Sequence, residues 1–372
     1  MREFLLCILV VITTAISFVA VAVVRRLAEQ LGLLDRPGHR KVHSVPVPLG
    51  GGIGIWFAVA VVFAAGTVAV YLVPVETSWM PELYRTHHAG LKTQTSRLWV
   101  LLGGGTVLMF LGLADDRRGL PWQLRLGIEF CVAAFVVYWQ GLQLTAFIDV
   151  PILTGLLSVV WIVLLVNSFN MLDNMDGLSG GVAMIACTML GLMLLARPES
   201  NTQASQLFVA TMLFVMAGAL LGFLFHNWPP ARIFMGDAGS YFVGYWIAIA
   251  TLLATYTDYR GTSQYAVLAP ICILAVPLYD TFSVVWIRLR NGRSPFQGDK
   301  KHFSHRLVEL GFSKKNAVLT IYLATLTCSL GSLLLTRTDL VGAGIVVAIV
   351  ACMLGLIGLL EYRAWHDHVD ES

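Results

Sequence analysis

Acidic residues in pairs and short runs are the residues of this sequence best suited to chemistry. Asp115 and Asp116 are adjacent and directly follow an apolar block, and Asn170, Asp173 and Asp176 follow a later block. Like-charge pairing raises the pKa of one carboxyl group, which suits a general base. Carboxylate and amide oxygens are also the hard ligands that Mg²⁺ prefers. Taken alone, each group could instead be a solvated loop or a polar helix end.

The spacing of the later run bears on metal binding. If the preceding helix continues through it, Asn170, Asp173 and Asp176 share one helical face. One amide and two carboxylates would then lie on a single stripe. The run is not an EF-hand, because the later ligands of that loop are missing.

A further aspartate lies among glycines. Asp237 follows Gly236 and precedes Gly239, and Ser240 is the predicted N-cap of the apolar block that begins there. The free N–H groups of a helix N-terminus bind phosphate, and an aspartate at that point could hold a metal ion against it. Asn227 begins the linker that leads to this segment. The alternative is a loop that only caps its helix.

Two basic segments provide cations for a phosphorylated ligand. The first contains Lys41 and His43 beside prolines and glycines, and the second contains His302, His305 and Arg306. Such segments could neutralise or clamp a diphosphate. Taken alone, they could equally signal topology or bind anionic lipid.

The composition places these residues in a membrane protein. Of 372 residues, 57% are hydrophobic and 13% are charged, and the mean hydropathy is +0.75. A soluble domain carries about 25% charged residues. The net charge of +3 is too small to indicate the strongly basic surface with which proteins bind nucleic acid. The six cysteines lie in apolar blocks without metal-ligand or redox spacing, so we interpret them as packing residues.

The expected fold is an all-α polytopic membrane protein with about eleven transmembrane helices, forming a single integral-membrane domain over residues 1–372. Threading these spans through a bilayer puts every polar cluster on one side, together with most of the Lys and Arg residues. Positive residues favour the cytoplasm, which predicts a cytoplasmic-face active site and an N-terminus outside. The spans run approximately over 4–24, 50–73, 98–114, 121–140, 153–169, 180–196, 206–226, 240–256, 266–287, 316–336 and 340–361.

Together these residue types indicate phosphoryl transfer. Carboxylates that hold a divalent ion, cations that neutralise phosphate and glycines that allow close backbone approach are the parts this chemistry needs. Asp280 is a further functional candidate, because it lies within a predicted span shortly after Pro277. The alternative is that Asp280 pairs with a neighbouring helix. From the residues alone, we predict a membrane enzyme that acts on phosphate esters at the cytoplasmic face.

The clusters between about residues 35 and 306 resemble the motif set of the polyprenyl-phosphate N-acetylhexosamine-1-phosphate transferases. The resemblance implies that Asp115 and Asp116 are the paired aspartates, the first being the base that deprotonates the lipid phosphate. It implies that Asp237 is the Mg²⁺ aspartate and that Asn170 also reaches the metal. The substrate-binding residues that it implies are Lys41, His43, Asp173, Asp176, Asn227, His302, His305 and Arg306.

Two positions depart from the family pattern. The segment 302–306 has Ser304 where the GlcNAc-1-phosphate branch has a histidine, in the pattern His-x-His-His-Arg. Asn174 stands where glycine is usual. The basic segment around Lys41 and the number of spans nevertheless look closest to the undecaprenyl-phosphate GlcNAc-1-phosphate transferase branch.

The resemblance implies transfer of N-acetylhexosamine-1-phosphate, GlcNAc-1-phosphate first among the candidates, from a UDP-sugar to undecaprenyl phosphate with release of UMP. It also implies Mg²⁺, with Mn²⁺ as the alternative ion, a bacterial cytoplasmic membrane, a role in starting a cell-envelope glycan, and a homodimer. Other donors, such as UDP-MurNAc-pentapeptide or another UDP-N-acetyl sugar, stay open. The alternatives from other classes are a cation-coupled transporter, although the charges gather at one face, and a non-catalytic scaffold.

Overall fold

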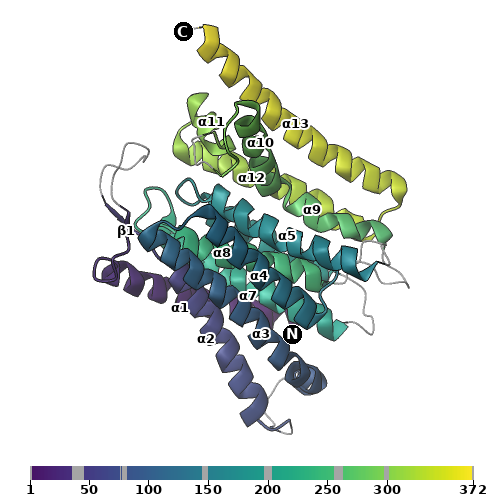
Figure 1. Ribbon diagram of the computed structural model, residues 1–372. Coiled ribbons are helices and arrows are strands. Elements are labelled where there is room, and N and C mark those ends of the chain that lie inside the picture. The colour runs from purple at the N-terminus through teal and green to yellow at the C-terminus, as the bar shows by residue number, and fades with distance from the viewer. Residues whose placement is uncertain are drawn as a thin grey trace.

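The protein is almost entirely helical (Figure 1). The computed structural model describes residues 2–35, 46–75, 77, 82–144, 150–196, 203–254, 263–296 and 301–370. Strands β1 (Leu34–Asp35) and β2 (Val47–Pro48) form a short antiparallel pair. The helices are α1 (Arg2–Leu27), α2 (Gly51–Leu72), α3 (Glu82–Arg118), α4 (Trp122–Gln140), α5 (Pro151–Leu172), α6 (Leu178–Leu195), α7 (Gln203–Asn227), α8 (Gly236–Leu253), η1 (Gln264–Leu268), α9 (Ala269–Ile273), α10 (Ala275–Arg290), α11 (Phe303–Glu309), α12 (Lys314–Leu333), η2 (Leu334–Thr336) and α13 (Leu340–Asp370).

Within the described residues, 8 helices are long and apolar enough to cross a membrane, namely α1, α2, α3, α5, α6, α7, α12 and α13. The total rises to 9 if the segment from η1 through α10, which is bent by 61°, counts as one span. The chain is therefore an all-α polytopic membrane protein. Helices α4 and α8 match the predicted spans 121–140 and 240–256 in position but are outside these 8, so the predicted number of about eleven stays a prediction.

Two predicted spans have a different shape in the structure. The span predicted at 98–114 is only the C-terminal half of α3, which has 37 residues. The span predicted at 266–287 is broken between Ile273 and Ala275. Pro277 lies in the first turn of α10, where its ring and missing N–H prevent a regular helical bond to the carbonyl of Ile273.

Helix α8 lies at the centre of the bundle, where α2, α3 and α5 pack around it (Figure 1). Tyr241, Tyr245 and Trp246 on this helix are among the largest fully buried side chains. The Tyr245 hydroxyl donates to the carbonyl of Leu101 at 2.9 Å, and the Trp246 indole donates to the carbonyl of Met212 at 3.1 Å. Because their polar atoms are paired, these rings fix α8 in the core without a desolvation penalty.

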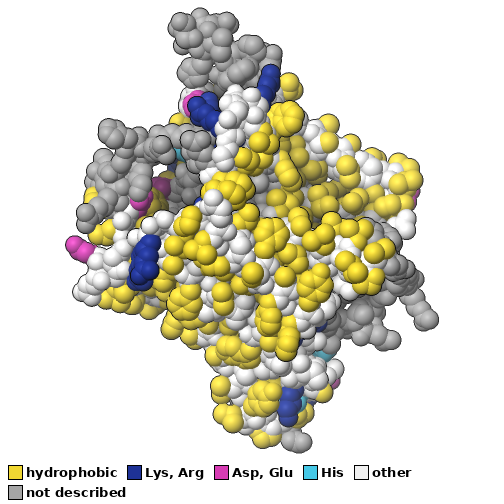
Figure 2. Space-filling view, in the orientation of Figure 1, with side chains coloured by type: hydrophobic (Ala, Val, Ile, Leu, Met, Phe, Trp, Pro, Cys, Tyr) yellow, Lys and Arg dark blue, Asp and Glu magenta, His cyan; other side chains and the backbone are white. Residues whose placement is uncertain are grey.

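Apolar side chains cover most of the outer face seen in Figure 2, whereas the few charged side chains in this view lie toward its edges. Large apolar residues are exposed on several helices, including Ile152 at 80%, Leu72 at 74% and Trp286 at 68%. Soluble monomers rarely expose contiguous apolar surface on this scale. The exposed apolar face fits contact with lipid.

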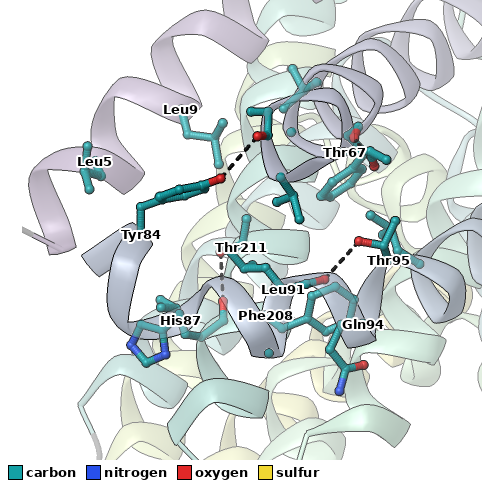
Figure 3. A pocket seen from close by; sticks show the side chains of 18 of the residues that line it. Leu5, Leu9, Thr67, Tyr84, His87, Leu91, Gln94, Thr95, Phe208 and Thr211 are labelled. Atoms are coloured by element: carbon teal, nitrogen blue, oxygen red, sulfur yellow. Dashed lines mark hydrogen bonds between the residues drawn. The ribbon is translucent and has the colours of Figure 1, made fainter. Parts of the chain in front are cut away.

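An apolar pocket of about 410 Å³ lies among the N-terminal parts of α1, α3 and α7 and the C-terminal part of α2 (Figure 3). Leu9, Leu91 and Phe208 contribute to its wall. The hydroxyl of Tyr84 lies against the last turns of α2, 3.2 Å from the carbonyl oxygen of Ala69. The acidic residues gather at the opposite ends of α2 and α3, so this pocket is separate from them.

Helix α3 approaches α8 closely at Gly112, so we expect any larger residue at this position to destabilise the protein. A Cβ at Gly112 would lie 2.3 Å from the backbone of Asp237. Gly112→Ala should therefore lower the stability by about 1–3 kcal/mol, as overpacking does, and lower the melting temperature in detergent. Gly103→Ala is the matched control on the same helix, with nothing within 4 Å. It should be neutral or stabilising, because alanine favours a helix. Equal melting temperatures for the two variants would contradict the close approach.

Candidate active site

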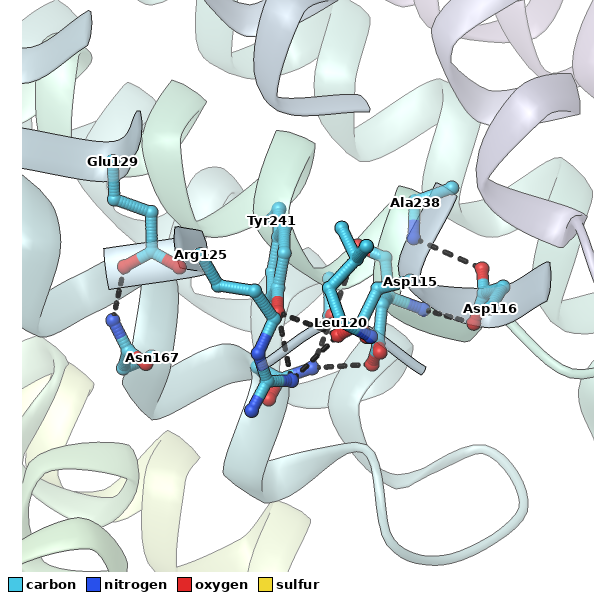
Figure 4. A network of polar contacts seen from close by, with 11 residues as sticks. Asp115, Asp116, Leu120, Arg125, Glu129, Asn167, Ala238 and Tyr241 are labelled. Atoms are coloured by element: carbon cyan, nitrogen blue, oxygen red, sulfur yellow. Dashed lines mark hydrogen bonds and ion pairs between the residues drawn. The ribbon is translucent and has the colours of Figure 1, made fainter. Parts of the chain in front are cut away.

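The C-terminal ends of α3 and α5 and the N-terminus of α8 meet at one end of the bundle. Asp116, in the last turn of α3, accepts the backbone N–H of Asp237 at 2.9 Å and that of Ala238 at 3.2 Å (Figure 4). The predicted aspartate pair and the predicted metal aspartate are 121 residues apart in sequence and are direct neighbours in space. The predicted aspartate pair and Asp237 therefore belong to one cluster.

Asp116 takes the place of a local N-cap for α8. The prediction that Ser240 caps this helix is wrong, because α8 begins at Gly236, after Met235, without a side-chain cap. Ser240 is instead buried inside the helix and accepts a hydrogen bond from Asn170 at 3.1 Å. A carboxylate from another helix satisfies the free N–H groups and complements the positive end of the helix dipole.

Asp115 has a separate set of partners. Its carboxylate accepts the backbone N–H of Leu120 at 2.6 Å and forms an ion pair with Arg125 at 2.5 Å (Figure 4). Tyr241 on α8 donates its hydroxyl to the same carboxylate at 3.3 Å. Asp115 is only 7% exposed. A buried polar group requires hydrogen-bonding partners, and Leu120, Arg125 and Tyr241 provide them for Asp115.

Arg125, Glu129 and Tyr241 belong to the site, although the sequence analysis assigned them no role. Glu129 is buried and accepts the side-chain amide of Asn167 at 2.5 Å. Glu129 lies inside a predicted span, and an ionisable residue there indicates a functional role. A cation in the first turn of a helix opposes the helix dipole, which was a signal that Arg125 has an acidic partner. Tyr241 lies in an apolar block and gave no signal.

Asp237 faces both the aspartate pair and α5. Its Oδ1 accepts the amide N–H of Asn170 at 2.6 Å, and its carboxyl group lies within hydrogen-bonding reach of Asp115. Two carboxyl groups that close require a proton or a cation between them. The amide oxygen of Asn170 has no hydrogen-bond donor within the described part of the chain. It is therefore available to a ligand.

The predicted single stripe of Asn170, Asp173 and Asp176 does not form. Helix α5 ends at Leu172, and the chain turns sharply because Gly177 adopts a left-handed conformation with φ 76°. Asp173 stays beside the cluster, where the Asp116 carboxyl group and the backbone of Gly236 influence its pKa. Asp176 turns away and accepts the backbone N–H of Ala231 at 2.9 Å. The two carboxylates thus face different parts of the site.

Asn227, predicted as a substrate contact, joins two loops of the site. Its amide oxygen accepts the backbone N–H of Gly177 at 2.8 Å, and its amide nitrogen donates to the carbonyl of Ile233 at 2.8 Å. Asn227 is only 3% exposed. These bonds hold the turn after α5 against the loop before α8, and contact with substrate stays a prediction.

The C-terminal basic segment is anchored to α10. The Asp280 carboxylate forms a hydrogen bond with His302 Nδ1 at 2.9 Å. It also accepts a hydrogen bond from the first backbone N–H of α11 at 2.7 Å. This is the pairing with a neighbouring segment that the sequence left as the alternative for Asp280. Arg306 is buried and donates to Ser283 of α10 at 3.1 Å. The rings of His302 and His305 lie 6.4 Å apart. His302 therefore lies at the N-terminus of α11, and His305 and Arg306 lie within that helix.

The cluster and the basic helix account for most of the predicted site residues. Lys41 and His43 lie outside the described residues, so their roles stay predictions.

The acidic cluster offers the chemistry of a magnesium site. Its donors are all oxygens, which is the ligand type that a hard divalent cation prefers. Gly236 keeps the space beside the cluster open, because a Cβ there would lie 2.6 Å from the Asp116 carboxylate. Within the described residues, no three His, Cys, Asp or Glu side chains already surround a metal-sized point. The residues fit Mg²⁺ by type, and binding it would require the side chains to rotate.

A helical membrane bundle with a carboxylate cluster at its helix ends defines a class of membrane enzymes that act on phosphate esters. Residues 98–255 match the family model of glycosyl transferase family 4. A Bacillus subtilis protein named as a probable undecaprenyl-phosphate N-acetylglucosaminyl 1-phosphate transferase is 32% identical, over 84% of this chain and 80% of its own length. The chain belongs to this family of sugar-phosphate transferases.

Two further relatives extend the similarity over most of the chain. A decaprenyl-phosphate N-acetylglucosaminephosphotransferase of Mycolicibacterium smegmatis is 32% identical, over 94% of this chain and 88% of its own length. An undecaprenyl-phosphate alpha-N-acetylglucosaminyl 1-phosphate transferase of Escherichia coli K12 is 27% identical, over 92% of this chain and 87% of its own length. These names confirm the predicted branch and favour an enzyme over a transporter or a scaffold.

The ion pair between Arg125 and Asp115 predicts a specific double-mutant result. Arg125→Met leaves Asp115 buried without its cation and should cost about 2 kcal/mol, less than a fully buried pair because the Arg125 side chain is 28% exposed. Adding Asp115→Asn should recover most of that loss. Thermal melting of the purified protein measures both effects. Arg118→Met, at an exposed position, is the control. Additive losses in the double variant would contradict the ion pair.

Asp173 predicts how stability depends on pH. Burial, followed by the charge of Asp116, raises the pKa of Asp173 to about 7 from 3.8. The folded protein therefore holds this proton more tightly than the unfolded chain does. The contribution to stability is fully present below pH 3.8 and is lost as the pH rises through 7. Without divalent cations, melting temperatures from about pH 5 to pH 8 should fall less for Asp173→Asn than for the wild type. Equal slopes would contradict the shift, and Glu309→Gln is the exposed control.

Proposed function

We propose that the protein transfers GlcNAc-1-phosphate from UDP-GlcNAc to undecaprenyl phosphate, releasing UMP, and thereby starts a cell-envelope glycan. The observation that carries the proposal is the single cluster formed by Asp115, Asp116, Asp237 and Asn170 from three separate helices. The curated relatives, which are named as polyprenyl-phosphate GlcNAc-1-phosphate transferases, support the sugar and the class of lipid.

In the proposed reaction, an oxygen of the lipid phosphate attacks the β-phosphorus of the donor. The bond between that phosphorus and the oxygen bridging to the α-phosphate breaks, and UMP leaves with the bridging oxygen. Asp115 or Asp116 removes a proton from the lipid phosphate or orients it. Arg125 and Tyr241 hold the Asp115 carboxyl group in place, and two backbone amides hold that of Asp116.

Asp237 and Asn170 are the residues that would hold the metal ion, which we propose to be Mg²⁺, with Mn²⁺ as the alternative. Asn170 Nδ2 orients Asp237 at 2.6 Å and leaves the amide oxygen of Asn170 free to bind. When bound, the ion neutralises charge on the donor diphosphate. Asp173 lies beside this group, and a bound cation would favour the charged form of its carboxyl group.

The basic residues would form the opposite wall for the donor. Asp280 holds His302 at the start of α11, and His305 and Arg306 follow on the same helix. Charge-assisted hydrogen bonds from such residues stabilise developing phosphate charge. We assign Lys41 and His43 to the same task on the basis of the family resemblance.

The proposed location is the bacterial cytoplasmic membrane, with the N-terminus outside and the active site facing the cytoplasm. The bias of Lys and Arg toward the predicted cytoplasmic linkers supports this orientation. A charged nucleotide-sugar reaches a site on that face without crossing hydrocarbon. We propose a homodimer from the family resemblance.

Asp237 gives the decisive test of the reaction. Asp237→Asn should lower UMP release from UDP-GlcNAc and undecaprenyl phosphate by more than about 100-fold, because one charged ligand of the diphosphate-neutralising ion is lost. The assay is run with purified protein, with and without Mg²⁺, and a melting curve checks that the variant is folded. Glu309→Gln, an exposed acid on α11, should keep wild-type turnover. Near-normal turnover of Asp237→Asn would remove Asp237 from the metal role.

The donor is tested separately. UDP-GlcNAc, UDP-MurNAc-pentapeptide and other UDP-N-acetyl sugars are compared with undecaprenyl phosphate as acceptor. We expect the highest kcat/KM for UDP-GlcNAc. A preference for another donor would correct the sugar and leave the reaction class in place.

A further inference from the structure

The two positions at which the sequence departs from the family pattern are in direct contact. The Ser304 hydroxyl donates to Asn174 Oδ1 at 2.5 Å, although the residues are 130 positions apart. Asn174 Nδ2 donates to the carbonyl of Met171 at 2.8 Å, which fixes the orientation of the amide. Ser304 is only 1% exposed, and Asn174 is half-buried.

This bond joins the two walls of the proposed donor pocket. Asn174 lies in the turn after α5, directly after Asp173 and two residues before Asp176. Ser304 lies in the first turn of α11, directly before His305. Any shift of this hydrogen bond therefore moves the carboxylates of one wall relative to the cations of the other.

Each wall has other anchors, but those act elsewhere. Asp280 attaches the start of α11 to α10, and the Tyr322 hydroxyl of α12 donates to the carbonyl of Gly177. Neither contact joins α11 to the turn that carries Asp173. The Ser304–Asn174 hydrogen bond does so. The acceptor side of the site, around Asp115, is held by a different set of contacts.

The space around this bond brings the two side chains into direct steric contact. Ser304 is buried, and its hydroxyl faces the Asn174 side chain, so a histidine at 304 would need the volume that Asn174 occupies. A glycine at 174 would release that volume.

We infer that Ser304 and Asn174 form a positioning pair that sets the affinity of the site for the nucleoside diphosphate part of its donor. The inference rests on the proposed function. Loss of the hydrogen bond should raise the donor KM without an equal change in kcat or in the acceptor KM. A neutral hydrogen bond corresponds to a change of about two- to tenfold.

The test is a double-mutant cycle on the full-length protein in detergent. UMP release is measured for Ser304→Ala, Asn174→Gly and the double variant, with UDP-GlcNAc and undecaprenyl phosphate varied in turn. Each single variant should raise the donor KM about two- to tenfold, and the double variant should be no worse than the worse single one. Ser329→Ala is the matched control, since that buried hydroxyl bonds only to the Thr325 carbonyl within its own helix.

Two further measurements keep the outcome clear. The rise in melting temperature caused by UDP reports donor affinity without turnover, and it should be smaller in both single variants than in Ser329→Ala. UMP release by the Ser304→His variant should be strongly impaired. Combining this substitution with Asn174→Gly should restore UMP release.

Additive effects in the cycle, or equal rises of both KM values, would overturn the pairing. A wild-type protein that releases no UMP would refute the proposed function instead. A wild type that turns over, with a donor KM that stays constant across the cycle, would refute the pairing alone.

Discussion

The hydrogen bonds from the N-terminus of α8 to Asp116 are the interaction on which the site depends. This carboxylate closes the end of α3 against the start of α8, with bonds of 2.9 and 3.2 Å to two successive backbone amides. The start of α8 carries Asp237, so the same contact places the metal-binding candidate beside the aspartate pair. Without it, the buried N–H groups of α8 would lack partners, and the cluster would lose its geometry.

The same solution occurs at a second helix. Asp280 of α10 accepts the first backbone N–H of α11, much as Asp116 does for α8. Most of the surrounding helices are apolar enough to lie in lipid, where polar backbone groups must be satisfied inside the protein. Carboxylates from neighbouring helices serve this need and at the same time concentrate negative charge where two loops meet. The carboxylates that complete these helix ends therefore lie beside the candidate site.

Glycines set the distance between these helices. A Cβ at Gly52 on α2 would lie 2.1 Å from the backbone of Gly239 on α8, and one at Gly112 on α3 would lie 2.3 Å from the backbone of Asp237. The start of α8 is thus clamped between α2 and α3 by backbone contact, as small residues permit in membrane bundles. Such contact leaves the backbone of these helix ends little freedom, so the acidic side chains start from closely spaced positions despite their mutual repulsion.

The sequence by itself determined the fold class and the segments that carry chemistry. Long apolar blocks specify membrane helices, and polar residues such as Asp115, Asp116 and Asp237 stand out against them because burying charge in lipid is costly. Only the tertiary structure decided which groups are partners. The capping of α8 by Asp116 rather than Ser240, the ion pair of Asp115 with Arg125 and the contact of Ser304 with Asn174 depend on how separate segments pack. Residue types and local spacing encode helices and burial, whereas contacts between distant segments arise only when those helices pack together.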